Sequence, residues 1–327
     1  MRAFVVTELG TPPIGEVREI DEPHGSHEWS YGRRLLIDVH ATGVSFPDVL
    51  QSRGEYQHGV PVPYVSGGEV AGTVLEAPVD SRLRPGDRVA ALTLWGGMAE
   101  RALALEQYTV KLPDSMSFVE GAALQLNYST AWFALYRVGL RAGETIAIHG
   151  AAGGVGTATI QVARALGAKV IALVSTAEKE RTARGAGAEH VVRTEPGWVE
   201  EIKNLTDGRG VSVVVDPVGG DRFTDSLRAL DVGGRVAVVG FAAGTIPTVK
   251  VNRLLLRDLS VVGVALAPYI ERHPEIAELM SRDLEQFAES GRIAPHVGNV
   301  LSLADGGEAL RVIDRREALG KVVVRVR

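Results

Sequence analysis

The stretch from Thr145 to Gly156 constrains the fold more than any other part of the chain. Residues Thr145 to His149 are mostly apolar, which predicts a short buried strand. Four glycines follow between Gly150 and Gly156, and apolar residues then recur at helical spacing up to Leu166. A strand, a glycine turn and a helix in this order predict the phosphate-binding turn of a dinucleotide fold.

Each part of this turn has a task in that interpretation. Gly153 lets the backbone approach a pyrophosphate, and Gly156 lets the helix pack closely on the strand. The helix N-terminus offers N–H groups and the positive end of its dipole to the phosphates. The first glycine of the usual G-x-G-x-x-G is Ala151 here, so a tight turn without a ligand is the alternative. The predicted cofactor contacts in the turn are Ala151, Gly153, Gly154, Val155 and Gly156.

Composition limits the classes of function. A length of 327 residues suggests about two domains. The formal net charge of -5 gives no electrostatic argument for nucleic acid or an anionic membrane as partner. There is no cysteine, which excludes disulfides and thiolate metal sites. No apolar run reaches the ~18 residues of a spanning helix, and the N-terminus lacks a signal-peptide pattern, so we expect a cytoplasmic protein.

The periodicity changes along the chain. Up to about residue 118, proline or glycine recurs between short apolar alternations, which predicts a barrel of strands and turns. Val119 to Val138 is predicted to be helical, and six short apolar strands then alternate with helices, which indicates a doubly wound parallel sheet. The tail is interpreted as a return to the first lobe. The predicted domains are 1–119, 120–265 and 266–327.

An ordered set of motifs resembles the medium-chain dehydrogenase/reductase superfamily and, within it, the zinc-free quinone oxidoreductases that use NADPH. The motifs are F-P-D-V at 46–49, G-G-E-V-A-G-T-V at 67–74, L-R-P-G-D-R-V at 83–89, G-G-M-A-E at 96–100, A-A-G-G-V-G at 151–156, G-A-K-V-I-A at 167–172, D-P-V-G-G at 216–220 and L-G-K-V-V-V at 319–324. The resemblance implies an α/β fold with a GroES-like β-barrel lobe and a Rossmann lobe. It also implies a homodimer, which pairs the apolar edge strand within Leu259 to Leu266 with its twin.

A catalytic zinc is not expected. Where the zinc enzymes of this superfamily carry a cysteine and a His-Glu pair, this chain resembles them only in part, with Ser45 and Gly68-Glu69. About three protein ligands are needed, and the eight histidines form no close ligand pair. Without a Lewis acid, reduction of an electron-poor quinone or α,β-unsaturated carbonyl is expected rather than alcohol oxidation.

The end of the second strand of the doubly wound sheet favours NADPH. NAD enzymes place an acidic residue there for the ribose 2′-hydroxyl, whereas this chain reads Val174-Ser175-Thr176. Ser175 can donate a hydrogen bond to a 2′-phosphate, and Lys179 can supply positive charge. In the NADPH enzymes that the chain resembles, a tyrosine near position 194 often helps to bind the 2′-phosphate. Arg193 is predicted to do the same here. The alternative for Lys179 is a solvated helix face.

The resemblance assigns further contacts on both sides of the reaction. Thr130, Val218, Phe241 and Val264 are predicted to touch the cofactor, although core packing would select the same types at the last three. Ser45 and Tyr56 are predicted to line the acceptor pocket, with Ser45 where many relatives carry asparagine. Asp48 is expected to cap the backbone rather than to donate protons.

These observations predict an NADPH-dependent, zinc-independent enzyme that transfers a hydride from nicotinamide C4 to a quinone or enone. Two alternatives stay open from the residues alone. One is an enoyl-thioester reductase, and the other is a crystallin-like protein that binds the cofactor without turnover. The physiological acceptor, the stereochemistry of hydride transfer and the proton donor are not determined by the sequence.

Overall fold

The computed structural model describes residues 1–57 and 59–327, which divide into two compact units. The β unit comprises Met1–Leu126 and Ala277–Arg327, and the α/β unit comprises Asn127–Ile276. The chain thus leaves the β unit once and returns to it. The boundaries predicted from the sequence, at 119 and 265, remain predictions.

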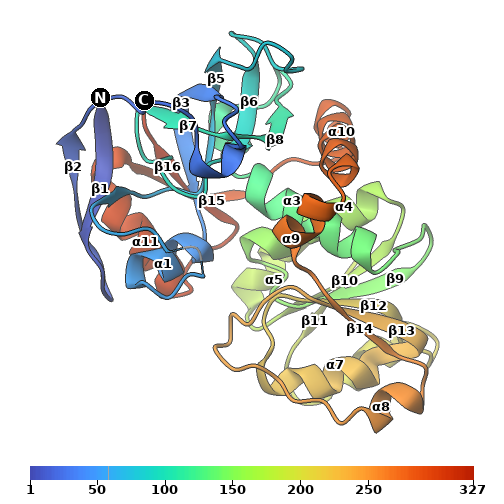
Figure 1. Cartoon of the computed structure of the whole chain (residues 1–327). Coiled ribbons are helices and arrows are strands. Elements are labelled where there is room, and N and C mark those ends of the chain that lie inside the picture. Colours follow the sequence, from blue (N-terminus) through green and yellow to red (C-terminus); the bar gives the residue numbers. More distant parts are fainter. Residues whose placement is uncertain (58) are drawn as a thin grey trace. The chain divides into compact units, whose positions relative to one another are not determined.

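The α/β unit contains a six-stranded parallel sheet with the order β11-β10-β9-β12-β13-β14. The order reverses beside β9, so its carboxyl end marks the switch point at which such sheets bind ligands. Helices α4 and α5 lie on one side of the sheet and α7 lies on the other (Figure 1). Its strands are β9 (Thr145–Ile148), β10 (Lys169–Val174), β11 (His190–Arg193), β12 (Val211–Asp216), β13 (Leu230–Val238) and β14 (Ser260–Gly263). Its helices are α3 (Gln125–Arg137, whose first two residues belong to the β unit), α4 (Gly154–Ala165), α5 (Ala177–Gly185), α6 (Trp198–Asn204), η2 (Gly220–Arg222), α7 (Phe223–Ala229), α8 (Asn252–Leu255) and α9 (Leu266–Arg272).

The β unit contains two sheets. The larger has the order β15-β16-β3-β5-β6-β8, with β7 paired to β3, and the smaller has the order β2-β1-β4. The strands are β1 (Arg2–Glu8), β2 (Ile14–Glu19), β3 (Leu36–Val44), β4 (Tyr64–Val65), β5 (Glu69–Glu76), β6 (Arg88–Leu92), β7 (Arg101–Leu103), β8 (Leu105–Lys111), β15 (Val297–Ser302) and β16 (Lys321–Arg325). The helices are η1 (Glu28–Ser30), α1 (Phe46–Arg53), α2 (Phe118–Gly121), α10 (Glu275–Glu289), η3 (Leu303–Asp305) and α11 (Gly306–Asp314).

Each unit has its own apolar core. In the α/β unit the inner strands are buried on both faces, as the continuous apolar run of Val213, Val214 and Val215 in β12 shows. In the β unit, Ile37 and Val89 pack in one cluster of the large sheet. Buried valines of β16 pack with α11 in another.

One predicted helix is divided. The sequence predicts a single helix over Val119 to Val138, but α2 ends at Gly121 and α3 begins at Gln125. The N–H of Leu126, in the first turn of α3, donates to a carboxylate oxygen of Glu69 at 2.9 Å. A carboxylate at a helix N-terminus is a favourable start for a new helix, which explains the break.

Candidate cofactor and acceptor sites

The glycine turn of the α/β unit has the geometry that a dinucleotide phosphate requires. It connects the carboxyl end of β9 to α4, and Gly150 has a φ of +59°. A Cβ on Gly156 would lie 2.2 Å from the Gly150 carbonyl oxygen, and a Cβ on Gly154 would lie 2.4 Å from Asn127 Nδ2. Backbone atoms therefore exclude a side chain at residue 156, and a side chain at residue 154 would require Asn127 to move. The start of a twelve-residue helix is left bare.

The other predicted cofactor residues lie along the same edge of the sheet. Ser175 follows β10, Arg193 ends β11, and Val218 follows β12. Phe241 and Val264 follow β13 and β14, so the carboxyl ends of the parallel strands gather these residues. Phe241 is 38% exposed and Val264 is half-buried, so neither belongs to the closed core. Thr130 is half-buried in α3, the helix whose Asn127 faces the glycine turn.

The end of β10 brings a hydroxyl and an ammonium together. Lys179 Nζ donates to Ser175 Oγ at 3.3 Å, and Thr176 caps α5 by accepting the Lys179 N–H. Arg193 approaches the same helix from β11, with its guanidinium 3.7 Å from Glu180. Ser175 and Arg193 are exposed, so their donors are available to a ligand. This cluster can bind a doubly charged phosphate.

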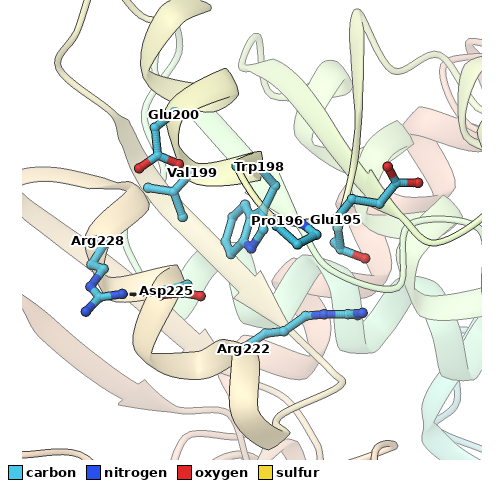
Figure 2. Close-up of a pocket in the computed structure, with 10 residues that line it drawn as sticks. Glu195, Pro196, Trp198, Val199, Glu200, Arg222, Asp225 and Arg228 are labelled. Carbon is cyan, nitrogen blue, oxygen red and sulfur yellow. Dashed lines mark hydrogen bonds and ion pairs between the residues drawn. The ribbon is translucent and has the colours of Figure 1, made fainter.

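A pocket of about 400 Å³ continues the carboxyl edge on the side of α6 and α7. Figure 2 shows Trp198 and Pro196 at its centre, with Arg222 extending toward the loop that carries Glu195 and away from the Asp225–Arg228 ion pair. The pocket is lined by Thr194, Glu195, Pro196, Gly197, Trp198, Val199, Glu200, Arg222, Asp225 and Arg228. The sequence analysis did not find this pocket, because its lining combines two segments that only the fold brings together.

His149 is buried and contacts Trp198, which lines the pocket. Its Nε2 lies 2.8 Å from Ser226 Oγ, and its ring meets Trp198 edge-on at 5.4 Å between centroids. Burial lowers the pKa of His149, and the nearby Asp216 carboxylate only partly opposes this effect. Asp216 itself accepts the N–H groups of Val218 and Gly219 at 2.8 and 2.9 Å, which fixes the turn after β12.

The predicted acceptor residue Ser45 belongs to a buried polar network in the β unit. The Lys321 ammonium donates to Ser45 Oγ and to Glu69 Oε1. Ser45 Oγ lies 3.4 Å from Glu69 Oε1. These side chains come from the junction of β3 and α1, the first residue of β5 and the first residue of β16. Lys321 was not among the predicted site residues. A lysine next to the apolar residues 322–324 indicates a buried charge, which could have pointed to it.

Asp48 performs the capping role expected of it. Its Oδ2 accepts the backbone N–H of Ser45 at 2.8 Å at the start of α1. Burial raises the pKa of Asp48 to about 6, while the bond from Ser45 and the charge of Lys321 act in the opposite direction.

The tyrosines differ in their surroundings. Tyr56 is half-buried, and burial followed by the charge of Asp48 raises the pKa of its phenol. Tyr64 is buried, and its hydroxyl has no hydrogen-bond partner among the described residues. Tyr128 donates to Gln161 at 2.8 Å in the α/β unit, so its hydroxyl is engaged. Tyr56 therefore remains the candidate phenol near Ser45, by its proximity to Asp48.

Two family models match the chain. Residues 31–114 match the alcohol dehydrogenase GroES-like domain, and residues 154–282 match the zinc-binding dehydrogenase family. The chain is 37% identical over 329 residues to quinone oxidoreductase-like protein 2 of Bos taurus, with 99% of the chain and 92% of the relative covered. It is 33% identical to the quinone oxidoreductase of Homo sapiens, with 99% and 97% covered.

The chain belongs to the quinone oxidoreductase-like family of the medium-chain dehydrogenase/reductase superfamily.

Solved structures of this family share the fold. The quinone oxidoreductase of Thermus thermophilus, described with its NADPH complex, has a TM-score of 0.84 at 33% identity, and both chains are fully covered. CurK enoyl reductase has a TM-score of 0.84 at 26% identity, with 99% of this chain and 98% of that chain covered. The predicted fold class, a GroES-like lobe plus a doubly wound Rossmann sheet, is confirmed.

Two questions about the described residues of this quinone oxidoreductase-like chain are whether they hold a metal site and whether they include a helix that could span a membrane. Across residues 1–57 and 59–327, no three His, Cys, Asp or Glu side chains gather in a way that could hold a metal ion. Within the same residues, no helix has both the length and the apolar composition to cross a bilayer.

Proposed function

We propose that the chain is an NADPH-dependent reductase of quinones or α,β-unsaturated carbonyl compounds. The observation that carries the proposal is the pair formed by Ser175 and Lys179 beside the bare glycine turn. No carboxylate stands at the end of β10 to bind a 2′-hydroxyl, and a serine hydroxyl and an ammonium converge there instead. The family to which the chain belongs supports the same reaction class.

The residues of the α/β unit fit NADPH along its length. The glycine turn and the N-terminus of α4 would hold the pyrophosphate, and Ser175, Lys179 and Arg193 would hold the 2′-phosphate. The pocket lined by Trp198 and Arg222 would hold the adenosine end. When bound, the cofactor supplies a hydride from C4 of its nicotinamide.

The acceptor side uses no zinc in this proposal. Glu69 lies in a position where a buried cation is required, and the Lys321 ammonium supplies that charge. An electron-poor acceptor needs orientation and a hydrogen-bond donor rather than a Lewis acid. Ser45 provides such a donor, and Tyr56 is a second candidate. The acceptor gains the hydride and a proton and leaves in its reduced form.

The test is to mix the protein with NADPH and a panel of quinones and enones and to follow nicotinamide absorbance. Oxidation with some acceptors, at equal rates after dialysis against a zinc chelator, is the expected result. No oxidation with any acceptor overturns the proposal. Tight NADPH binding without turnover would favour a crystallin-like binding protein instead.

An enoyl-thioester reductase is the second candidate, favoured by the likeness to CurK enoyl reductase. The reaction differs only in the acceptor, because a thioester carbonyl replaces the ketone. Including crotonyl thioesters in the panel separates the two candidates, since the preferred class gives the larger kcat/KM.

The chain is also proposed to form a homodimer. β14 is the last strand of its sheet, and Val261 on it is 40% exposed. The neighbouring Leu255 and Leu256 are 82% and 76% exposed. An exposed apolar strand edge favours pairing with a second copy.

A further inference from the structure

Ser45, Glu69 and Lys321 form a buried charged group of the β unit with one member close to the surface. Glu69 is 1% exposed and Lys321 is 3% exposed, whereas Ser45 is 8% exposed. The charged pair is therefore shielded from solvent, and the serine hydroxyl belongs to the least buried member.

Within this group, the hydroxyl proton of Ser45 has no hydrogen-bond acceptor at a normal distance. Lys321 donates to both Ser45 Oγ and Glu69 Oε1, and Glu69 Oε2 accepts the Leu126 N–H at 2.9 Å. The acceptor that the Ser45 hydroxyl proton meets is Glu69 Oε1 at 3.4 Å, which is long for an O–H···O bond. Asp48 already caps the Ser45 N–H. The Ser45 oxygen thus accepts a hydrogen bond from Lys321. Its own proton is available to a better hydrogen-bond acceptor, such as a carbonyl oxygen.

The backbone makes room for this arrangement. A Cβ on Gly43 would lie 2.7 Å from Lys321 Cε, 2.8 Å from Glu69 Cγ and 2.1 Å from the Ala122 carbonyl oxygen. These side chains fit between their elements only because residue 43 has no side chain. A buried ion pair adds little net stability compared with apolar residues of the same volume, so stability alone does not account for it.

We propose that Lys321, paired with Glu69, is a positioning residue that holds the Ser45 hydroxyl as a hydrogen-bond donor to the acceptor's carbonyl oxygen. This inference rests on the proposed reductase function. When a hydride is delivered to the acceptor, a C–H bond forms at its carbon and the displaced electron pair moves onto its oxygen, which becomes anionic. Ser45 stabilises that oxygen, with the ammonium behind it, and water then supplies the proton. Glu69 keeps the lysine charged and fixed in place.

The experiment is a double-mutant cycle on kcat with NADPH and 1,4-naphthoquinone. The variants are Ser45→Ala, the neutral pair Lys321→Met with Glu69→Gln, and all three changes together. Ser45→Ala is expected to lower kcat about 100-fold, as loss of one oxyanion donor does, with KM and NADPH affinity unchanged. Lys321→Met/Glu69→Gln should also lower kcat, and the triple variant should fall no further than Ser45→Ala.

Controls separate this role from a structural one. Ser52→Ala removes another buried hydroxyl, which donates to Val49 in the same helix, and should leave kcat unchanged. Ser45→Thr keeps the hydroxyl and should restore most of the lost kcat. If the paired variant does not fold, Ser45→Ala and Ser45→Thr still decide whether the hydroxyl acts.

Two results overturn the inference while the proposed function stands. One is a wild-type protein that turns over with kcat unaffected by Ser45→Ala or by the neutral pair. The other is a triple variant whose loss of kcat equals the product of the losses measured for Ser45→Ala and for the neutral pair, which would mean that the lysine acts independently of the serine. A wild-type protein that oxidises no NADPH with any acceptor fails at the earlier step and removes the proposed function as well.

Discussion

The choice between the two nicotinamide cofactors depends on single side chains at the end of β10. The Nζ of Lys179 lies 3.3 Å from Ser175 Oγ. NADH lacks the 2′-phosphate that this ammonium would bind. Lys179→Ala is expected to reduce the ratio of NADPH to NADH affinity by at least about tenfold, since a hydrogen bond to a charged group contributes about 1.5–3 kcal/mol. Equilibrium fluorescence titration with both cofactors measures the ratio.

A matched control for that change is Lys203→Ala, which removes a lysine from the last turn of α6. It should leave the cofactor ratio at the wild-type value. Ratios near unity for both the wild type and Lys179→Ala would mean that the phosphate site is assigned to the wrong residues.

Asp48 is expected to make stability depend on pH. The folded pKa of about 6 lies above the ~3.9 of an unfolded aspartate, so the folded state holds the proton more tightly. Its contribution to stability is complete below about pH 4 and is lost as the pH rises through 6. Asp48→Asn still accepts the Ser45 N–H but cannot titrate. The free energy of unfolding of this variant relative to wild type should therefore rise by on the order of 2 kcal/mol between pH 4 and pH 7.5.

Urea unfolding at both pH values measures that difference. Parallel profiles for the wild type and Asp48→Asn would contradict the prediction.

At the residue scale, the sequence indicates contacts between near neighbours in the chain, whereas the role of Ser175 and Lys179 as a phosphate site stays a prediction. Asp48 caps a residue three positions before it, and Lys179 contacts a residue four positions before it. Contacts at such short spacings can be inferred from the sequence. Lys321 contacts Ser45 across 276 positions and Glu69 across 252. No periodicity encodes such a contact, because it depends on how β16 pairs with β3.

At the scale of elements, the glycine turn has a sharp geometric test. Gly156→Ala would place a methyl group 2.2 Å from the Gly150 carbonyl oxygen, so α4 must move away from β9. We expect loss of measurable NADPH binding and destabilisation of about 1–3 kcal/mol, as for other overpacked sites. Fluorescence titration and thermal unfolding measure the two effects.

Gly185→Ala provides the comparison, because a Cβ there meets nothing within 4 Å and the residue is helical. It should preserve NADPH binding and raise stability by about 0.4–1 kcal/mol. Equal cofactor affinity in both alanine variants would show that the close approach at Gly156 is not required.

Several strand boundaries of the doubly wound sheet could be predicted, because short apolar runs between turn residues mark where such strands begin and end. The predicted strands Lys169–Val174, His190–Arg193 and Val211–Asp216 agree with β10, β11 and β12. The predicted helix over Val119 to Val138 was wrong as a single element, because its break is made by the distant carboxylate of Glu69. Apolar periodicity continues through residues 122–124 and carries no sign of that contact.

At the scale of the whole molecule, the exposed edge of β14 predicts the oligomeric state. Light scattering should give about twice the mass of 34.8 kDa for one chain. Val261→Asp places a charge on that edge and should yield monomers, because a desolvated unpaired charge is costly. Val79→Asp changes a fully exposed valine of the β unit and should leave the dimer intact. A monomeric wild type would contradict the proposed pairing.

The position of β16 has a consequence for the order in which the molecule matures. Residues 321–325 form an inner strand between β15 and β3, and they bring the lysine of the Ser45 network. During synthesis, residues 127–276 can collapse around their own sheet while the larger sheet of the β unit still lacks this strand. Newly made chains should therefore acquire a protease-resistant α/β fragment first and reductase activity only after residue 325 has cleared the ribosome.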